Sequence, residues 1–357
     1  MTQFHSLTVA QLRRETSDAV CVSLEVPTEQ DATFAFTPGQ YLTFEHTIDG
    51  ETVRRPYSIC SSPSAHCLQV GIKAVEGGKF SQFANTSLAV GDTLEVMPPE
   101  GRFRVSLDPA HRKHYLLLAA GSGITPILSI ATSVLESEAD SRVTLIYGNR
   151  DTASVMFRDT LDDLKNRYLD RLRITWLMSR EPQDVALHAG RLDSAKLDEL
   201  FAAGLLSAEH IDEVFLCGPG DFIDGLETAL HARGIDDSRI HHERFSTGDA
   251  PAILRKPKAE QASTGCQVTV HLDGASRVFG FERTDNSLID AARRAGIDLP
   301  WSCKGGMCCT CRCKKVQGDA EMRANFSLEA WEMDAGYVLA CQLEPHSNTL
   351  ELDFDAS

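Results

Sequence analysis

The stretch Cys303-Lys-Gly-Gly-Met-Cys308-Cys-Thr-Cys311 spaces three cysteines as C-x4-C-x2-C, and Cys341 follows after 29 intervening residues. This spacing is one in which four thiolates surround a [2Fe-2S] cluster. The two glycines of the loop have no Cβ, so its backbone N–H groups can approach the cluster sulfurs closely. The spacing therefore predicts a [2Fe-2S] site with these four cysteines as its iron ligands.

Two other interpretations of the cysteine loop stay open at this point. A structural zinc site usually uses two C-x2-C pairs, and only one short pair of that form fits here. Buried or redox-active cysteines without a metal are the second alternative. Cys309 and Cys313 fall outside the ligand spacing, and packing is the simplest interpretation of both, since free cysteine is often buried.

The pattern of residues 266–357, which contain this loop, predicts one compact α+β unit. A strand over 267–272 and a helix over 288–295 precede the cysteines, and closing strands follow. The preceding segment, residues 246–265, is polar, contains two prolines and has no clear period. Such a composition is typical of a linker.

Residues 112–245 alternate apolar strands with helical patterns, which predicts a parallel sheet covered by helices on both faces. The run Gly121-Ser122-Gly123-Ile124-Thr125-Pro126 follows the first strand and precedes a helix. Cys217-Gly218-Pro219 ends a later strand. Ligands of open α/β sheets bind beyond the carboxyl ends of the strands, where both motifs fall. A plain tight turn is the alternative for the two glycines of the first motif.

Residues 1–104 carry short apolar stretches between regular turn signals, which predicts a small antiparallel barrel. Arg55-Pro56-Tyr57-Ser58 lies in one such stretch, and Gly77-Gly78-Lys79-Phe80-Ser81 leads into a helix. Arginine pairs with phosphate, tyrosine stacks on flat rings, and glycines before a helix open an anion site. Taken alone, Tyr57 is more simply a core residue of the barrel.

Length and composition agree with a folded protein of two or three domains. The chain has 357 residues, of which 42% are hydrophobic and 24% charged, and its net charge is −16. An acidic chain does not suit nucleic acid as a partner. No apolar run reaches the ~20 residues of a membrane helix, and the N-terminus lacks a secretory pattern. We therefore expect no membrane, and a reducing, cytoplasmic location.

The motifs together identify a family. Residues 1–245 resemble the ferredoxin–NADP reductase superfamily, through RRPYSICSSP, AAGSGITP, LIYGNR and HHERF, and residues 266–357 resemble a plant-type ferredoxin. The resemblance implies a multidomain fold with an antiparallel β-barrel flavin domain, an α/β nucleotide domain and a β-grasp ferredoxin domain. It implies FAD, a [2Fe-2S] cluster and NADPH as the electron donor. Electrons would pass singly from the cluster to a di-iron oxygenase.

The same resemblance implies roles for residues that match the family's motifs. Flavin contacts would come from Arg55, Tyr57, Ser58, Gly78, Lys79, Phe80 and Ser81. The nicotinamide nucleotide would lie on Gly121, Gly123, Thr125 and Pro126. Ser58, Cys217 and Glu243 match the catalytic positions, and Phe245 stands near the place of an aromatic that shields the flavin.

Three residues predict a preference for NADPH over NADH. Arg150 follows the second strand of the nucleotide domain, and Ser179 and Arg180 end the third. Cations at this edge would pair with the 2′-phosphate, whereas sites selective for NAD usually offer an acid. Two solvated strand-end arginines are the alternative.

Two further functions stay open. The chain could serve a different oxygenase, such as a ring hydroxylase or an acyl desaturase. It could also be a redox sensor without enzymatic turnover.

Overall fold

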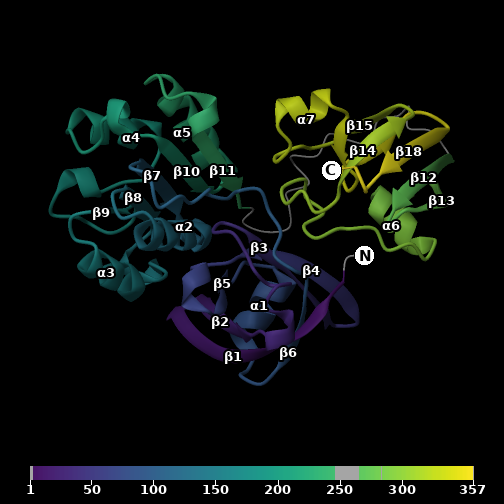
Figure 1. Ribbon diagram of the computed structural model, residues 1–357, viewed down its shortest axis with the longest axis horizontal. Coiled ribbons are helices and arrows are strands. Elements are labelled where there is room, and N and C mark those ends of the chain that lie inside the picture. The colour runs from purple at the N-terminus through teal and green to yellow at the C-terminus, as the bar shows by residue number, and fades with distance from the viewer. Residues whose placement is uncertain (1–2, 246–264, 283, 357) are drawn as a thin grey trace. The chain divides into compact units, whose positions relative to one another are not determined.

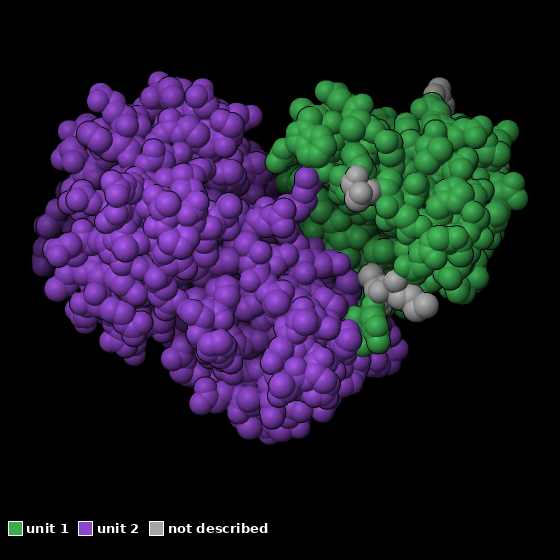
Figure 2. All heavy atoms as spheres, viewed as in Figure 1, with its two compact units in different colours: residues 1–4, 54–56, 248–357 green, residues 5–53, 57–247 purple. Residues whose placement is uncertain are grey.

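The computed structural model describes residues 3–245, 265–282 and 284–356. Contacts divide the chain into two compact units (Figure 2). The larger comprises residues 5–53 and 57–247, and the smaller comprises residues 248–357 with the short stretches 1–4 and 54–56. The larger unit holds the predicted barrel and nucleotide domains together, so their mutual contacts belong to one structure.

The first part of the larger unit is a six-stranded antiparallel sheet in the order β4-β3-β6-β1-β2-β5 (Figure 1). An antiparallel bridge between Ile59 and Val70 joins the two edge strands and closes the sheet into a barrel. A single helix, α1 (Lys79–Thr86), follows β5. The strands are β1 (His5–Thr16), β2 (Ala19–Glu25), β3 (Tyr41–Ile48), β4 (Glu51–Ser58), β5 (Leu68–Lys73) and β6 (Thr93–Val96).

The second part of the larger unit is a five-stranded parallel sheet in the order β11-β10-β7-β8-β9. Its strands are β7 (His114–Ala120), β8 (Arg142–Asn149), β9 (Leu172–Met178), β10 (Glu213–Gly218) and β11 (Ile240–Arg244). Four helices connect them: α2 (Ile124–Ser137), α3 (Arg158–Arg167), α4 (Ser194–Ala202) and α5 (Gly220–His231).

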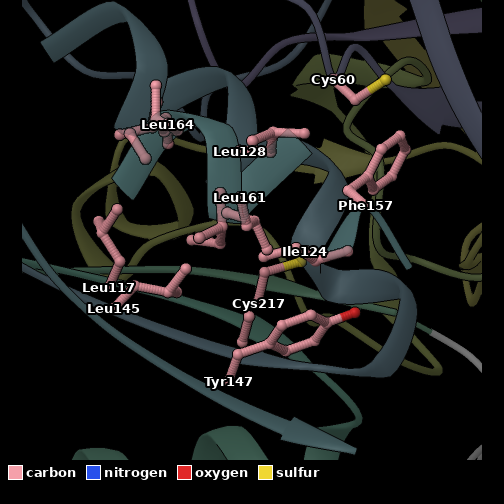
Figure 3. Packing of buried hydrophobic residues seen from close by; sticks show 14 of the residues in the cluster. Cys60, Leu117, Ile124, Leu128, Leu145, Tyr147, Phe157, Leu161, Leu164 and Cys217 are labelled. Carbon is pink, nitrogen blue, oxygen red and sulfur yellow. The ribbon is translucent and has the colours of Figure 1, made fainter. Parts of the chain in front are cut away.

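Side chains alternate between the two faces of this sheet, and each face has its own core. Leu117 and Leu145 pack with residues of α2 and α3 on one face, together with barrel residues such as Cys60 (Figure 3). Leu116 and Ile146 pack with α4 and α5 on the other. The first core is shared by the sheet and the barrel, which fixes the two parts against each other.

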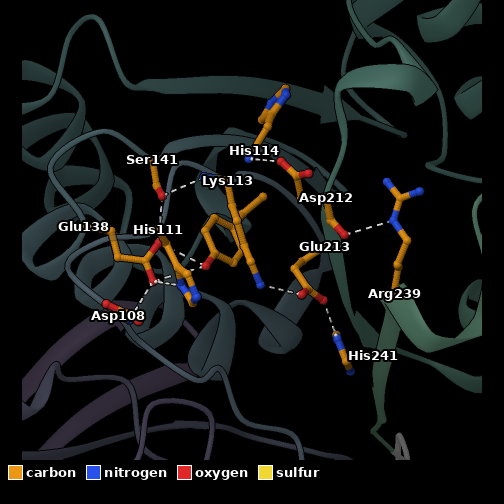
Figure 4. A network of polar contacts seen from close by, with 11 residues as sticks. Asp108, His111, Lys113, His114, Glu138, Ser141, Asp212, Glu213, Arg239 and His241 are labelled. Carbon is orange, nitrogen blue, oxygen red and sulfur yellow. Dashed lines mark hydrogen bonds and ion pairs between the residues drawn. The ribbon is translucent and has the colours of Figure 1, made fainter.

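A buried carboxylate anchors the start of the nucleotide sheet (Figure 4). Glu138, which has no exposed surface, accepts hydrogen bonds from the hydroxyls of Tyr115 and Ser141 and contacts Nδ1 of His111 at 2.9 Å. These partners come from β7 and from the segments before β7 and after α2. The network is structural and lies away from the carboxyl ends of the strands.

The smaller unit is built on a mixed five-stranded sheet in the order β13-β12-β18-β14-β16. Helix α6 (Leu288–Arg294) packs against β13, and the short α7 (Ala330–Asp334) precedes β16. A two-stranded sheet, β15 (Ala320–Met322) with β17 (Leu343–Pro345), flanks it. The main strands are β12 (Cys266–Leu272), β13 (Ala275–Phe281), β14 (Arg312–Gln317), β16 (Tyr337–Leu339) and β18 (Thr349–Asp353).

The predicted fold class is confirmed in all three parts. Sequence reasoning missed α4 and β11, because each is short and has a weak apolar pattern. Residues 246–264, which form nearly all of the predicted linker, lie outside the described residues. None of the described helices is long and apolar enough to cross a membrane.

Candidate functional site

The glycine turn before α1 has the form of an anion site. Gly77 has a φ of +74°, and a Cβ on Gly78 would lie 2.5 Å from the hydroxyl of Ser81. Gly78 caps α1 without a side-chain hydrogen bond from the described residues, and a helix N-terminus behind glycines suits an anion. Ser81 holds the turn: its hydroxyl accepts from the Val75 N–H and donates to the Gly78 carbonyl.

Tyr57 lies beside this turn on β4. Its ring packs edge-on against Phe44, with centroids 5.9 Å apart, and at 5.5 Å from Phe80, the second residue of α1. Phe80 is fully buried, whereas Tyr57 is only half-buried. One side of the Tyr57 ring is thus held by the core, and the ring keeps some exposed surface. Lys79, exposed at the start of α1, pairs with Glu51.

The second glycine turn, Gly121–Gly123, joins β7 to α2. A Cβ on Gly123 would lie 2.1 Å from the Cys217 carbonyl, so this glycine lets the turn press on the end of β10. The Tyr147 hydroxyl donates to the Gly121 carbonyl at 2.9 Å, and the Thr125 hydroxyl donates to the Ser122 carbonyl. These contacts fix the turn at the carboxyl edge of the sheet, where a nucleotide phosphate can meet the N-terminus of α2.

Three predicted catalytic residues from distant parts of the sequence meet in the larger unit. The hydroxyl of Ser58, at the end of β4, donates to the carboxylate of Glu243 on β11 at 3.0 Å. Glu243 stands opposite Cys217 in the parallel pairing of β11 with β10. The barrel and the nucleotide sheet therefore contribute to one site. A chain of contacts runs from β4 through β11 and β10 to the turn before α2.

Burial shapes the electrostatics of this site. Desolvation raises the pKa of Glu243 to about 7, and the hydrogen bond from Ser58 offsets part of that rise. Burial also raises the pKa of the Cys217 thiol well above its usual value, with the nearby Glu243 carboxylate adding to the effect. Cys217 is therefore a neutral thiol at neutral pH, and the carboxyl group of Glu243 can hold a proton.

Phe245 and Arg55 make contacts of their own, apart from the hydrogen bond between Ser58 and Glu243. The Phe245 N–H donates to the Gly218 carbonyl, and its ring packs partly buried against the core shared with the barrel. The Arg55 guanidinium donates to the Arg54 carbonyl at 2.8 Å. The flavin roles of both residues stay predictions.

Arg150 follows β8 and Arg180 follows β9, and the backbones of these two segments are hydrogen-bonded to each other. The Arg180 N–H donates to the Arg150 carbonyl, and both the N–H and the hydroxyl of Ser179 donate to the Asn149 carbonyl. Glu181 accepts from the backbone and hydroxyl of Thr152, so its charge is engaged in the loop after β8.

The Arg150 side chain is half exposed and contacts Asp18 of the barrel at 3.4 Å. Asp18 is a residue that sequence reasoning did not single out, because nothing in the sequence signals a contact across 132 positions.

In the smaller unit the four predicted iron ligands come together. The Cys303 N–H donates to Cys308 Sγ at 3.5 Å, so these two cysteines lie together, as do Cys311 and Cys341. Backbone N–H groups point at the sulfurs: that of Gly305 donates to Cys303 Sγ at 3.2 Å, and that of Cys341 to Cys311 Sγ at 3.5 Å. This two-and-two pairing suits a two-iron cluster, since each iron takes two thiolates besides the bridging sulfides.

Within the described ranges, no three His, Cys, Asp or Glu side chains are arranged to hold a single metal ion. A [2Fe-2S] cluster is larger than one ion and needs a wider cage. The thiol pairs and the sulfur-directed N–H groups fit that group. The two remaining cysteines of the loop are placed differently: Cys313 is fully buried in the core of the unit, and Cys309, with a φ of +58°, donates to the Ser327 hydroxyl.

Comparisons with known proteins agree with this arrangement. Residues 6–105 match the oxidoreductase FAD-binding domain, residues 117–228 the oxidoreductase NAD-binding domain, and residues 270–346 the 2Fe-2S iron-sulfur cluster binding domain. These matches support FAD, NAD(P)H and a [2Fe-2S] cluster as the redox partners of the chain. The domain boundaries predicted from the sequence stay predictions.

Two curated relatives match nearly the whole chain. A component of the 1,2-phenylacetyl-CoA epoxidase of Escherichia coli is 46% identical over 356 residues, covering 100% of this chain and 99% of the relative. The ferredoxin reductase component of a Rhodococcus rhodochrous 3-ketosteroid-9-alpha-monooxygenase is 35% identical over 98% of this chain and 96% of its own. Among solved structures, phthalate dioxygenase reductase shares the fold, with a TM-score of 0.60, 23% identity and 98% coverage of both chains.

Proposed function

The chain belongs to the family of oxygenase reductase components that join FAD-binding, NAD-binding and [2Fe-2S]-binding domains, and on that premise we propose that it reduces a di-iron oxygenase that epoxidises phenylacetyl-CoA. The chain is an oxidoreductase, and its relatives support an oxygenase as its partner. The specific oxygenase rests on the 46% identity to the Escherichia coli epoxidase component. NADPH is the donor that we propose.

One structural observation carries the electron-transfer function. The end of β4, the end of β11 and the glycine turn before α2 meet in the larger unit, while the smaller unit brings four cysteines together. When bound, FAD and the cluster supply the conversion of a two-electron donor into single electrons. The chain positions those groups and needs no general acid or base of its own for that task.

Each part of the larger unit then has a defined task. We propose that the N–H groups at the start of α1 bind the flavin pyrophosphate and that Tyr57 stacks on a flat ring of FAD. The turn Gly121–Gly123 would hold the nucleotide phosphates at the N-terminus of α2. Ser58 and Glu243 would meet the reacting rings, with Ser58 orienting the carboxyl group of Glu243.

In the smaller unit, Cys303, Cys308, Cys311 and Cys341 would bind the two irons. The backbone N–H groups that already point at their sulfurs would stabilise the thiolates. The paired strands β14 and β16 fix the loop on one side, and next to them the Ala340 N–H donates to the Cys311 carbonyl.

Reconstitution with purified oxygenases tests the choice of partner. We expect NADPH-dependent epoxidation of phenylacetyl-CoA when the chain is mixed with the oxygenase components of a phenylacetyl-CoA epoxidase. A ring hydroxylase and an acyl desaturase serve as comparison acceptors. Faster turnover with either of these would assign the chain to that oxygenase instead. Steady oxidation of NADPH with an artificial acceptor separates every one of these functions from a redox sensor.

A further inference from the structure

We propose that Gln342 tunes the iron-sulfur centre: its side-chain amide donates a hydrogen bond to the sulfur of Cys341 and thereby raises the reduction potential of the cluster. The inference deepens the proposed function and rests on its assignment of Cys341 as an iron ligand. Gln342 carries no thiol, and the cysteine spacing does not involve it.

The geometry around Gln342 is specific. Its Nε2 lies 3.4 Å from Cys341 Sγ and 2.8 Å from the carbonyl oxygen of Lys304, and its side chain has no exposed surface. A carbonyl and a thiolate both accept hydrogen bonds, so the NH2 group and not the oxygen must face them. The amide thus donates one hydrogen bond to the proposed ligand Cys341 and one to Lys304, the residue that follows the proposed ligand Cys303.

Packing alone does not explain an amide at this position. The Gln342 Oε1 atom is buried and has no hydrogen-bond partner among the described residues. A buried polar atom without a partner is unfavourable, and a methionine or leucine would fill the same space without it. The unfavourable burial of the amide oxygen is therefore offset by the hydrogen bonds of the NH2 group, which a methionine or leucine could not make.

The cluster loop also makes room for this side chain. Gly306 has a φ of +79°, and a Cβ at that position would lie 3.2 Å from Gln342 Cγ and 3.1 Å from the Ala324 carbonyl oxygen. Any other residue at position 306 would push against the Gln342 side chain. One of the two glycines of the loop is thus matched to Gln342 as well as to the backbone turn.

A hydrogen bond to a ligand sulfur changes the redox balance. Reduction adds one electron, and the added negative charge is shared with the thiolates, so a donor stabilises the reduced cluster more than the oxidised one. Loss of the Gln342 N–H should then make the cluster harder to reduce. With the donor in place, the cluster is a better acceptor for electrons from the flavin.

The test is a redox titration of the full-length, cofactor-loaded protein, followed by the EPR signal of the reduced cluster. Gln342→Met removes the donor at similar length. Gln342→Glu keeps the shape but places oxygen atoms opposite two acceptors. Gln317→Met makes the same substitution at an exposed position of β14 and serves as the control. Iron per chain is measured for every variant.

We expect the equilibrium constant for cluster reduction to fall about threefold to tenfold in Gln342→Met, where a factor of ten corresponds to about 59 mV for one electron. The fall should be larger in Gln342→Glu and absent in Gln317→Met. A wild-type or higher potential in iron-loaded Gln342→Met or Gln342→Glu would overturn the proposal.

The redox titration needs no oxygenase, so it tests the role of Gln342 even if the proposed oxygenase is not the partner. Full iron in Cys341→Ser would instead show that the ligand assignment is wrong.

Discussion

Cys341 is the residue on which the iron-sulfur assignment can be tested most simply. It lies 30 positions from Cys311, yet its backbone N–H donates to Cys311 Sγ at 3.5 Å. We expect Ser substitution at any of the four predicted ligands to lower the iron bound per chain and to bleach the cluster absorbance. Cys309→Ser should keep full iron, because the Cys309 thiol is turned to the Ser327 hydroxyl. Cys313→Ala should also keep it, since that thiol lies in the apolar core.

Glu243 predicts a pH dependence of stability. Its pKa in the folded chain is about 7, above the ordinary value of 4.5, so the folded state binds more protons than the unfolded state between these values. The contribution of Glu243 to the free energy of unfolding is therefore fully present below about pH 4.5 and is lost as the pH rises through 7. Glu243→Gln should stabilise the protein by about 1–2 kcal/mol at pH 8 and by almost nothing at pH 4.5.

The measurement for Glu243 is the difference in thermal midpoint between the variant and the parent at several pH values. The difference should grow from pH 5 to pH 8. Ser58→Ala, which removes the hydroxyl that stabilises the carboxylate, should make that difference keep growing to higher pH and reach a larger final value. An equal difference at all pH values would contradict the raised pKa.

At the scale of elements, the ends of β8 and β9 decide the nucleotide preference. Because Arg150 and Arg180 are joined through the Arg150 carbonyl, their positions at the sheet edge are linked. Replacing either with Ala should cost about 1.5–3 kcal/mol in kcat/KM for NADPH and little for NADH.

Asp18→Asn is the control for this pair of arginines, because it removes the partner that Arg150 has in the barrel. If the arginines act on the 2′-phosphate, this variant should bind NADPH at least as well as the parent. Equal losses for NADPH and NADH in the two arginine variants would mean that they stabilise the fold and do not read the phosphate.

Some elements and contacts could be predicted from the sequence, and others could not. The alternation of apolar runs and helical patterns predicted a parallel α/β sheet over residues 112–245, and the cysteine spacing predicted the four cysteines that lie together. The contact of Ser58 with Glu243 could not be derived from pattern, because it joins residues 185 positions apart. The role of Gln342 was equally hidden, since a glutamine beside a cysteine has no distinctive local signal.

For the whole molecule, the distribution of charge predicts how it meets its partner. Residues 266–357 carry nine basic and fourteen acidic side chains, and residues 1–245 have a net charge of −12. Both parts are acidic, so we expect a basic docking patch on the oxygenase. The rate of reconstituted turnover should fall between roughly 50 and 300 mM salt, whereas NADPH oxidation with a small neutral acceptor should not. A turnover rate independent of salt would argue against electrostatic docking.

The composition of residues 246–265 predicts that the two halves of the chain function separately. Proteolytic cleavage within this segment should release a flavoprotein that still oxidises NADPH with an artificial acceptor but no longer supplies the oxygenase. The measurement is FAD content and NADPH oxidation of the purified fragment. Loss of FAD on cleavage would show that the two halves form one cooperative unit.

Anaerobic reduction of the protein by NADPH is the most direct test of electron transfer through FAD to the cluster within one chain. NADPH is added to the loaded protein without oxygen or oxygenase, and the flavin absorbance and the EPR signal of the reduced cluster are followed together. We expect both centres to be reduced in the parent protein, and only the flavin to be reduced in Cys341→Ser. A cluster that stays oxidised while the flavin is fully reduced in the parent protein would contradict it.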